Sequence, residues 1–262
     1  QQTIKPESNT LRFYFMRVTL MAETNNLQVM IHDFHVAFGH PTFPFRSVVK
    51  GVKDWSIIGN EVNAENLSNE AIANLRLKLL NEEIQEGFNA ARVFYGDEGS
   101  TREAFIEIVD AVGDVLVLTL GTSCVYNLVL DCPSYDVCDE AQALLNGREL
   151  NVGLVFQLLF DELESLQHYL KVSTAAPKKA ILQAAAVSRT LQNMVNLCFA
   201  HASAYGYNLF EVVREIHRSN MSKLGEDGRP IYREDGKIQK GPNYFKPNLA
   251  AVLDKNDAVF PV

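Results

Sequence analysis

Apolar residues recur every three or four positions along most of the 262-residue chain, and the alternating pattern of a β-strand is almost absent. This spacing predicts helices over 27–39, 69–94, 101–130, 152–171, 177–203 and 209–221. The remaining segments read as a loop up to about residue 68, an irregular stretch with one short helical piece between Cys132 and Gly153, and a tail from Leu224 rich in Gly, Pro and charge. The expected fold class is therefore all-α.

Residues that favour helix ends mark several of these boundaries. Gly39, followed by His40 and Pro41, is expected to stop the first helix. Ser68 is the expected N-cap of the next helix, and Ser100 or Thr101 the N-cap of the one after it. The connection at 95–100 is short, which favours an antiparallel arrangement of the two helices that it joins.

Composition excludes some classes of protein. The formal net charge is -8, so the chain lacks the overall positive charge typical of nucleic-acid binding. The four cysteines show no CxxC pair and no zinc-finger spacing, which predicts reduced thiols in a cytoplasmic protein. The longest apolar stretch, 115–130, contains Thr, Ser and Asn, and we expect a buried helix there and no membrane association.

The start of the chain lacks the apolar core and cleavage site of a signal peptide. Residues 1–22 are expected to form an N-terminal extension, with Met16 and Met21 as plausible natural starts. The length allows one large domain or two small ones and is ample for a sizeable core. Residues 23–262 are expected to form a single all-α domain.

Two short stretches, NEEIQEG at 81–87 and EIVDAVGD at 107–114, place carboxylates inside otherwise apolar runs. Residues three, four and seven apart share a helix face, so each stretch forms an acidic stripe. The stripes consist of Glu82, Glu83 and Glu86 on one helix and Glu107, Asp110 and Asp114 on the next. Antiparallel helices would bring the stripes together, which is costly without a compensating charge. The oxygen ligands suit Mg²⁺, or Mn²⁺. The alternative for any single glutamate is a solvated helix face.

The chain also contains a faint internal repeat. Residues 75–93 align with 154–172, and residues 121–127 align with 202–208. The apolar pattern persists in both copies, but most of the carboxylates do not: Glu86, Glu107, Asp110 and Asp114 align with Ser165, Ser188, Leu191 and Val195. This predicts a duplicated helical hairpin, with a catalytic copy at 69–130 and a degenerate copy at 152–203. The alternative is a chance likeness of two amphipathic hairpins.

The pattern EExxE followed by ExxD, here Glu82-Glu83-x-x-Glu86 and Glu107-x-x-Asp110, resembles the all-α nucleoside triphosphate pyrophosphatase superfamily. That superfamily includes MazG-like proteins, dimeric dUTPases and phosphoribosyl-ATP pyrophosphohydrolases. EIVDAVGDVLVLTLGT looks like the second metal helix of phage and bacterial MazG-like members, and 212–249 is similar to their tail, with its SNMSK and DGKxxKGPNY signatures. In compact members the ExxD helix runs almost directly into SNMSK, whereas here a long stretch with the second hairpin intervenes.

The resemblance implies Mg²⁺-dependent hydrolysis of a nucleoside or deoxynucleoside triphosphate to the monophosphate and pyrophosphate, in the cytoplasm of a bacterium or a phage-infected cell. The implied metal ligands are Glu83, Glu86, Glu107 and Asp110, with Asp114 an alternative to Asp110. These residues and Glu82 form the implied catalytic set, in which Glu82 orients or deprotonates the attacking water; alternatively, Glu82 is an outer-face acid. The chain is expected to be either a homodimer or a monomer whose second hairpin replaces a partner subunit.

The tail is locally basic: seven basic and four acidic residues lie between Arg218 and Lys246. Such residues in a Gly-rich segment suit a triphosphate, and we expect 209–262 to close over the substrate. The expected phosphate-binding residues are Asn220, Lys223, Lys237 and Lys240, which match the signatures, together with Arg218 and Arg233. The alternative is a solvated tail with no ligand.

The sequence contains fewer features that indicate a nucleoside pocket. Phe34, His35 and Tyr244 are candidates to contact the base, although aromatic residues at helical spacing more often belong to a core. His32 and His35 lack an evident third metal ligand, which favours ordinary satisfied or exposed histidines. Phage relatives imply a deoxynucleotide such as dGTP or dUTP, and an alarmone is a further alternative. A catalytically inactive nucleotide sensor or scaffold of the same fold is the rival function.

Overall fold

The computed structural model describes residues 27–42, 62–96, 101–130, 150–232 and 238–255. These residues form helices, turns and two isolated β-bridges, with no strand among them, so the predicted all-α class is confirmed. After a first helix at 27–37, the helices are α2 (Ala64–Leu67), α3 (Glu70–Phe94), α4 (Arg102–Tyr126), α6 (Val152–Ala175), α7 (Ala180–Ala204), α8 (Leu209–Met221) and α9 (Leu249–Lys255). A 3-10 turn at Pro177–Lys179 precedes α7.

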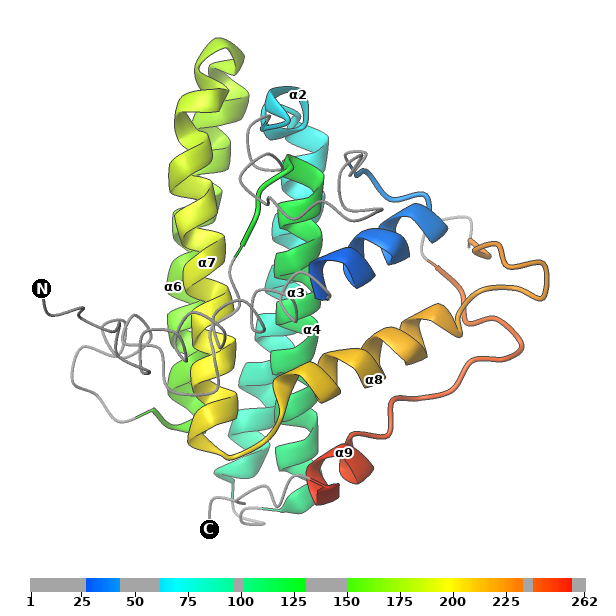
Figure 1. The fold of residues 1–262 in the computed structure, drawn as a ribbon. Helices are drawn as coiled ribbons and strands as arrows, with labels where there is room; N and C mark the ends of the chain where they lie inside the picture. Colours follow the sequence, from blue (N-terminus) through cyan, green and yellow to red (C-terminus); the bar gives the residue numbers. More distant parts are fainter. Residues whose placement is uncertain (1–26, 43–61, 97–100, 131–149, 233–237, 256–262) are drawn as a thin grey trace, which may run out of the picture.

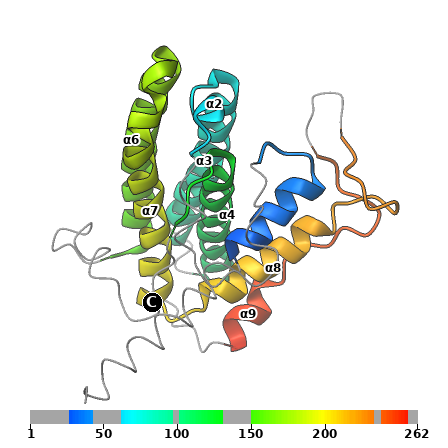
Figure 2. The ribbon, with the colours of Figure 1, turned by 45° about the horizontal axis from the view of Figure 1, so that its top comes forward.

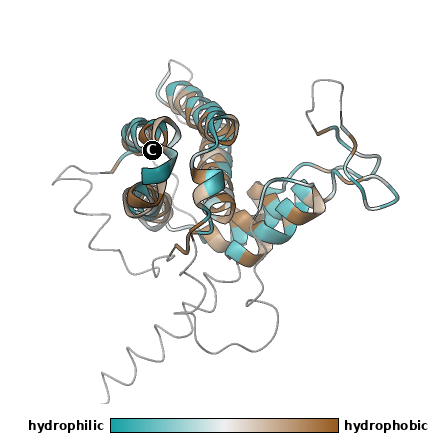
Figure 3. Ribbon diagram, turned by 90° about the horizontal axis from the view of Figure 1, so that it is seen from above, coloured by the Kyte–Doolittle hydropathy of each residue, from teal (hydrophilic) through white to brown (hydrophobic). Residues whose placement is uncertain are grey.

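Four long helices form the centre of the molecule (Figure 1). The hairpin α3–α4 packs on the hairpin α6–α7, with α3 against α6 and α4 against α7. Gly87 of α3 allows this approach, because a Cβ atom there would lie 2.0 Å from Cε1 of the buried Phe156 on α6. Seen along the bundle, the helices carry both hydrophilic and hydrophobic residues, as amphipathic helices around a shared core do (Figure 3).

The first helix and α8 lie side by side on the other side of the α3–α4 hairpin, so three layers follow one another (Figure 2). Gln28 fixes the first helix to the end of α4, because its Nε2 donates to Ser123 Oγ at 2.8 Å and to the Leu128 carbonyl at 2.7 Å. Gly113 of α4 faces α8, where a Cβ atom would lie 2.3 Å from Ile216 Cδ1. Helix α9 packs on both α4 and α8.

Several predicted helix ends are confirmed. The side chain of Thr101 accepts a hydrogen bond from the Ala104 amide at 3.1 Å and caps α4. Gly39 adopts a φ of 62° just after the first helix, a conformation that glycine adopts without strain. Helix α8 occupies the predicted range 209–221. The apolar stretch from Val115 to Tyr126 lies inside α4 and is buried, as expected, apart from the half-buried Leu118.

Two predicted boundaries are wrong. Ser68 does not cap α3; Asn69 does, through its Oδ1 and the Ile72 amide at 3.1 Å, while the Ser68 hydroxyl donates back to the Ala64 carbonyl in the unpredicted α2. Helix α4 ends at Tyr126 instead of Leu130, because Asn127 adopts a left-handed φ of 53° and turns the chain away.

Other differences concern short elements. The tail predicted to be irregular contains α9, and α6 continues to Ala175. The N-terminal extension, Ser100 and most of the irregular stretch after Cys132 lie outside the described residues. Among the described helices, none has the length and apolar character that crossing a membrane requires.

Candidate metal and phosphate site

The antiparallel pairing of α3 and α4 brings the two predicted acidic stripes together. Glu83 of α3 is half-buried, and its pKa is raised to about 7, first by burial and then by the nearby Glu86, Asp110 and Glu82. Lys223 opposes this rise. Carboxylates from two helices therefore share one electrostatic environment, which the helical spacing alone could only suggest.

Asp110 and Asp114 occupy successive turns of α4 in this cluster. Burial, followed by the charge of Glu107, raises the pKa of Asp110 to about 6, while Lys246 and Lys223 oppose the rise. The pKa of Asp114 is raised well above its ordinary value, first by burial and then by Asp110 and Glu83. Both aspartates belong to the cluster, so both are candidate metal ligands.

The remaining acids of the two stripes lie nearer to solvent. Glu86 and Glu107 are exposed. Glu82 is 45% exposed at its side chain, and its Oε1 lies 3.8 Å from Nζ of Lys78 one turn earlier. Glu83, Asp110 and Asp114 thus form the inner part of the cluster, with Glu82, Glu86 and Glu107 at its rim.

The donor set fits a hard divalent cation, because it consists of carboxylate oxygens, the ligands that such cations prefer. Burial disfavours the negative charge of Glu83, Asp110 and Asp114, and a bound cation would compensate that charge. Within the described ranges, however, no three His, Cys, Asp or Glu side chains stand close enough together to hold a metal ion. Coordination would therefore require the side chains to turn toward a common point. Mutual repulsion resists such a movement when no cation compensates the carboxylates.

A pocket opens beside the acidic cluster. Its volume is ≈ 170 Å³, and α4, α8 and the tail contribute to its walls. The charged and amide side chains along it are Glu107, Asp110, Asp114, Asn220, Lys223 and Lys246. Carboxylates from α4 and lysines from beyond α8 thus line one small space, and both lysines act electrostatically on Asp110.

Hydrogen bonds hold the tail against α8 at this pocket. The Ser219 hydroxyl donates to the Phe245 carbonyl at 2.8 Å, and the Asn248 amide donates to Glu215 Oε1 at 2.7 Å. Lys223 Nζ donates to Asn220 Oδ1 at 2.6 Å. The chain segment around residue 246 is therefore fixed on both sides, and two predicted phosphate-binding residues, Asn220 and Lys223, lie together.

The other predicted phosphate-binding residues are placed differently. Arg218 is exposed and makes two hydrogen bonds to Glu215, at 2.9 and 2.8 Å, while its guanidinium lies 4.5 Å from the centre of the Phe245 ring. Lys240 Nζ lies 4.4 Å from the centre of the Tyr244 ring. Arg233 and Lys237 lie outside the described residues. Lys246 lines the pocket but was not among the predicted residues, although it belongs to the same basic stretch.

The predicted base-contacting residues divide between two places. Tyr244 lines the acidic pocket. Phe34 instead packs on Phe38, with ring centres 4.5 Å apart. His35 is buried, its Nδ1 lies 3.1 Å from the Pro41 carbonyl, and burial followed by the charge of Arg76 lowers its pKa to about 3. This environment is that of a neutral, hydrogen-bonded core histidine.

A buried arginine lies further along the interface between α3 and α4. Arg76 of α3 donates from Nε to Thr122 Oγ1 at 2.9 Å and from Nη2 to the Leu118 carbonyl at 2.7 Å. Gly121 makes room for it, because a Cβ atom there would meet His35 Nε2 at 2.6 Å and Arg76 Nη2 at 2.9 Å. These hydrogen bonds join α3 to α4 within the two turns that follow Asp114. No motif in the sequence predicted them.

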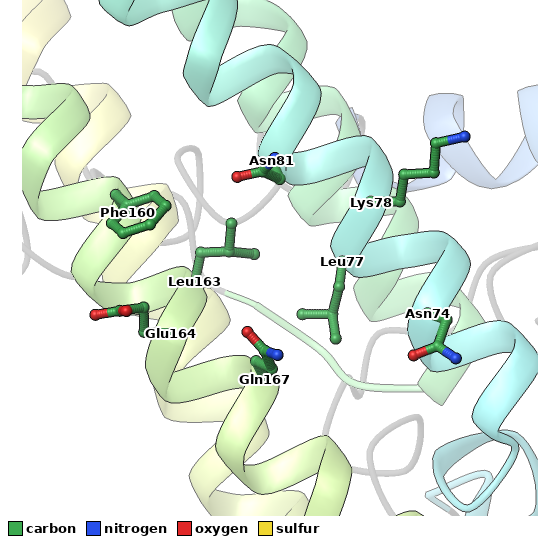
Figure 4. Close-up of a pocket in the computed structure, with 8 residues that line it drawn as sticks. All are labelled: Asn74, Leu77, Lys78, Asn81, Phe160, Leu163, Glu164 and Gln167. Carbon is green, nitrogen blue, oxygen red and sulfur yellow. The ribbon is translucent and has the colours of Figure 1, made fainter.

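A second, larger pocket of ≈ 300 Å³ lies between α3 and α6 (Figure 4). Leu77, Leu163 and Phe160 provide its apolar surface, and amides with one lysine and one glutamate surround them. By helical position it opens on a different face of α3 from Glu83 and Glu86. Its one acid and one lysine are both exposed, so it offers no comparable concentration of charge.

No family model matches the sequence, and neither the curated proteins nor the solved structures contain a significant match. The assignment of the site therefore depends on its own residues.

Proposed function

We propose that the chain is an Mg²⁺-dependent nucleoside triphosphate pyrophosphohydrolase, which cleaves a nucleoside or deoxynucleoside triphosphate to the monophosphate and pyrophosphate. The observation that carries this proposal is the pocket that Asp110 and Asp114 line together with Lys223 and Lys246. The carboxylates suit the cation of a metal–phosphate complex, and the lysines suit its phosphate oxygens.

The acidic cluster is suited to a cation that arrives with its substrate. The residues that would hold one or two Mg²⁺ ions are Glu83 and Asp110 of the inner part, with Asp114 close by, and Glu86 and Glu107 of the rim. Bound Mg²⁺ would neutralise charge on the phosphates. Mn²⁺ prefers the same type of ligand and is expected to substitute.

Glu82 is the proposed group that orients the attacking water. It neighbours Glu83, whose pKa it helps to raise, and it lies at the exposed rim where water has access. The oxygen of this water would bond to the α-phosphorus while the bond from that phosphorus to the oxygen bridging to the β-phosphorus breaks. The water proton would pass to Glu82, and pyrophosphate would leave.

The resemblance to MazG-like proteins supports the same reaction. The acids of the EExxE and ExxD patterns are the ones that share an electrostatic environment between α3 and α4. We propose that the hairpin α6–α7 takes the place of a partner subunit's hairpin, since it packs along α3–α4. Because Leu191 and Val195 replace the aspartates there, each chain would carry one active site.

A nucleotide-binding protein without hydrolytic activity is the second candidate. The observation that favours it is that no three acidic side chains in the described part of the chain already stand in a geometry that could hold a metal ion. Such a protein would bind a triphosphate through Lys223 and its neighbours but would not activate water.

The test is an end-point screen of the common nucleoside and deoxynucleoside triphosphates with Mg²⁺, in which chromatography separates monophosphate and pyrophosphate from diphosphate and phosphate. We expect monophosphate and pyrophosphate in equal amounts from one or a few nucleotides, and neither product when EDTA replaces Mg²⁺. Diphosphate and phosphate as products would reject the proposed bond cleavage. Absence of any product with either Mg²⁺ or Mn²⁺ would favour the binding protein.

A further inference from the structure

The pocket beside the acidic cluster is too small for a whole nucleotide. Its ≈ 170 Å³ lies below the range of about 300–1,000 Å³ that small-molecule sites usually occupy. Apolar surface from Ile106 and Ile216 flanks it, but the groups that converge on it are charged. A compact, highly charged group therefore matches this space better than a base or a sugar.

Lys246 is held at this pocket by its neighbours. On the N-terminal side of Lys246, the Phe245 carbonyl accepts a hydrogen bond from Ser219. On the C-terminal side, the Asn248 amide donates a hydrogen bond to Glu215. The side chain of Lys246 is exposed, so it keeps the freedom to turn toward a ligand. Its charge opposes the rise in the pKa of Asp110, which lines the same pocket.

Lys223 approaches the same space from the end of α8. It is half-buried, and its bond to Asn220 Oδ1 orients the ammonium group. Arg218 lies nearby in the chain, but its guanidinium is engaged by Glu215 in two hydrogen bonds. Lys223 and Lys246 are therefore the cations that line this pocket in the described part of the chain.

We propose that this pocket binds the pyrophosphate end of the triphosphate and that Lys246 is one of its phosphate ligands, while the carboxylates of the same pocket would hold the accompanying cation. This inference rests on the proposed function and assigns the orientation of the substrate. The nucleoside lies outside the pocket, and released pyrophosphate occupies it as a product.

Calorimetric titration of the full chain with inorganic pyrophosphate in the presence of Mg²⁺ tests this assignment. Lys246→Gln should weaken binding by about tenfold to a hundredfold, since a hydrogen bond to a charged group is lost. Lys246→Arg keeps the charge and should bind within about threefold of the wild type. Lys255→Gln makes the same charge change at an exposed residue at the end of α9 that does not line the pocket, and it should bind like the wild type.

The outcomes separate the two proposals. If the wild type hydrolyses a triphosphate and Lys246→Gln binds pyrophosphate as tightly as the wild type, the assignment of Lys246 is wrong while the proposed function stands. Equal weakening by Lys255→Gln would also overturn it, because a general charge effect would then explain the loss. If the wild type neither binds pyrophosphate nor hydrolyses any nucleotide, both proposals fall. Melting curves of the three variants confirm that each is folded.

Discussion

Replacing Glu83 with glutamine is expected to slow pyrophosphohydrolysis at pH 8 by a hundredfold or more, on the order of the loss seen when one electrostatic contact to a transition state is removed. The same change should raise the melting temperature of the metal-free protein. Glu83 is half-buried among Glu86, Asp110 and Asp114, so its negative charge opposes folding when no cation is bound. Glutamine keeps the size of the side chain and removes that charge. For a chain of this size, each kcal/mol corresponds to about 2–4 °C.

Glu162→Gln is the matched control. Glu162 aligns with Glu83 in the second hairpin, is also half-buried, and accepts a hydrogen bond from Asn193 Nδ2 at 3.0 Å. Its neighbours are not the acids of the proposed site, so the rate should stay close to that of the wild type. Wild-type activity in Glu83→Gln would remove this carboxylate from catalysis. A rate loss accompanied by a lower melting temperature would indicate damage to the fold.

The stability difference between Glu83→Gln and the wild type should grow as the pH rises. The folded-state pKa of Glu83, about 7, lies above the ordinary value of 4.5. A raised folded-state pKa means that stability is fully present below the unfolded pKa and is lost as the pH rises through the folded value. The wild type should therefore lose stability relative to the variant between about pH 5 and 8. The buried His35 and His201, whose pKa values burial lowers, act in the opposite sense but equally in both proteins.

Mg²⁺ should reverse this loss at pH 8. A ligand at a hundredfold excess over its Kd adds about 2.7 kcal/mol, or roughly 5–10 °C in melting temperature here. The gain should be much smaller at pH 5, where protons compete for the carboxylates, and smaller in Glu83→Gln at either pH. Melting curves of both proteins at pH 5 and 8, with and without Mg²⁺, measure all of these differences. An Mg²⁺ effect of equal size in both proteins would place the cation elsewhere.

The helical bundle could be predicted from the sequence because it follows from local spacing. Helices α3, α4, α6, α7 and α8 each carry several turns of periodic apolar residues, and their ends lie near the predicted positions. Helices α2 and α9 were missed because one or two turns give too little periodicity to recognise. At the start of α3, Ser68 and Asn69 are both good capping residues, and the hydrogen bonds of α2 decide between them.

In the candidate site, too, only the features that follow from local spacing could be predicted. The acidic stripes were among them, because helical spacing places Glu83 with Glu86 and Asp110 with Asp114. The role of Lys246 could not be predicted, because its position depends on hydrogen bonds between the tail and α8 that join residues 26 and 33 positions apart. The path of the tail likewise places Tyr244 at the acidic pocket, which its aromatic character alone could not reveal.

The claim that the carboxylates of α3 and α4 form a divalent metal centre is tested most directly by anomalous diffraction from crystals soaked in Mn²⁺. An anomalous peak between Glu83 and Glu86 on one side and Asp110 and Asp114 on the other is the predicted result. A second peak toward Lys246 is not expected without phosphate, because the ammonium repels the cation. A map with ordered Mn²⁺ at other sites and none between these carboxylates would contradict the account.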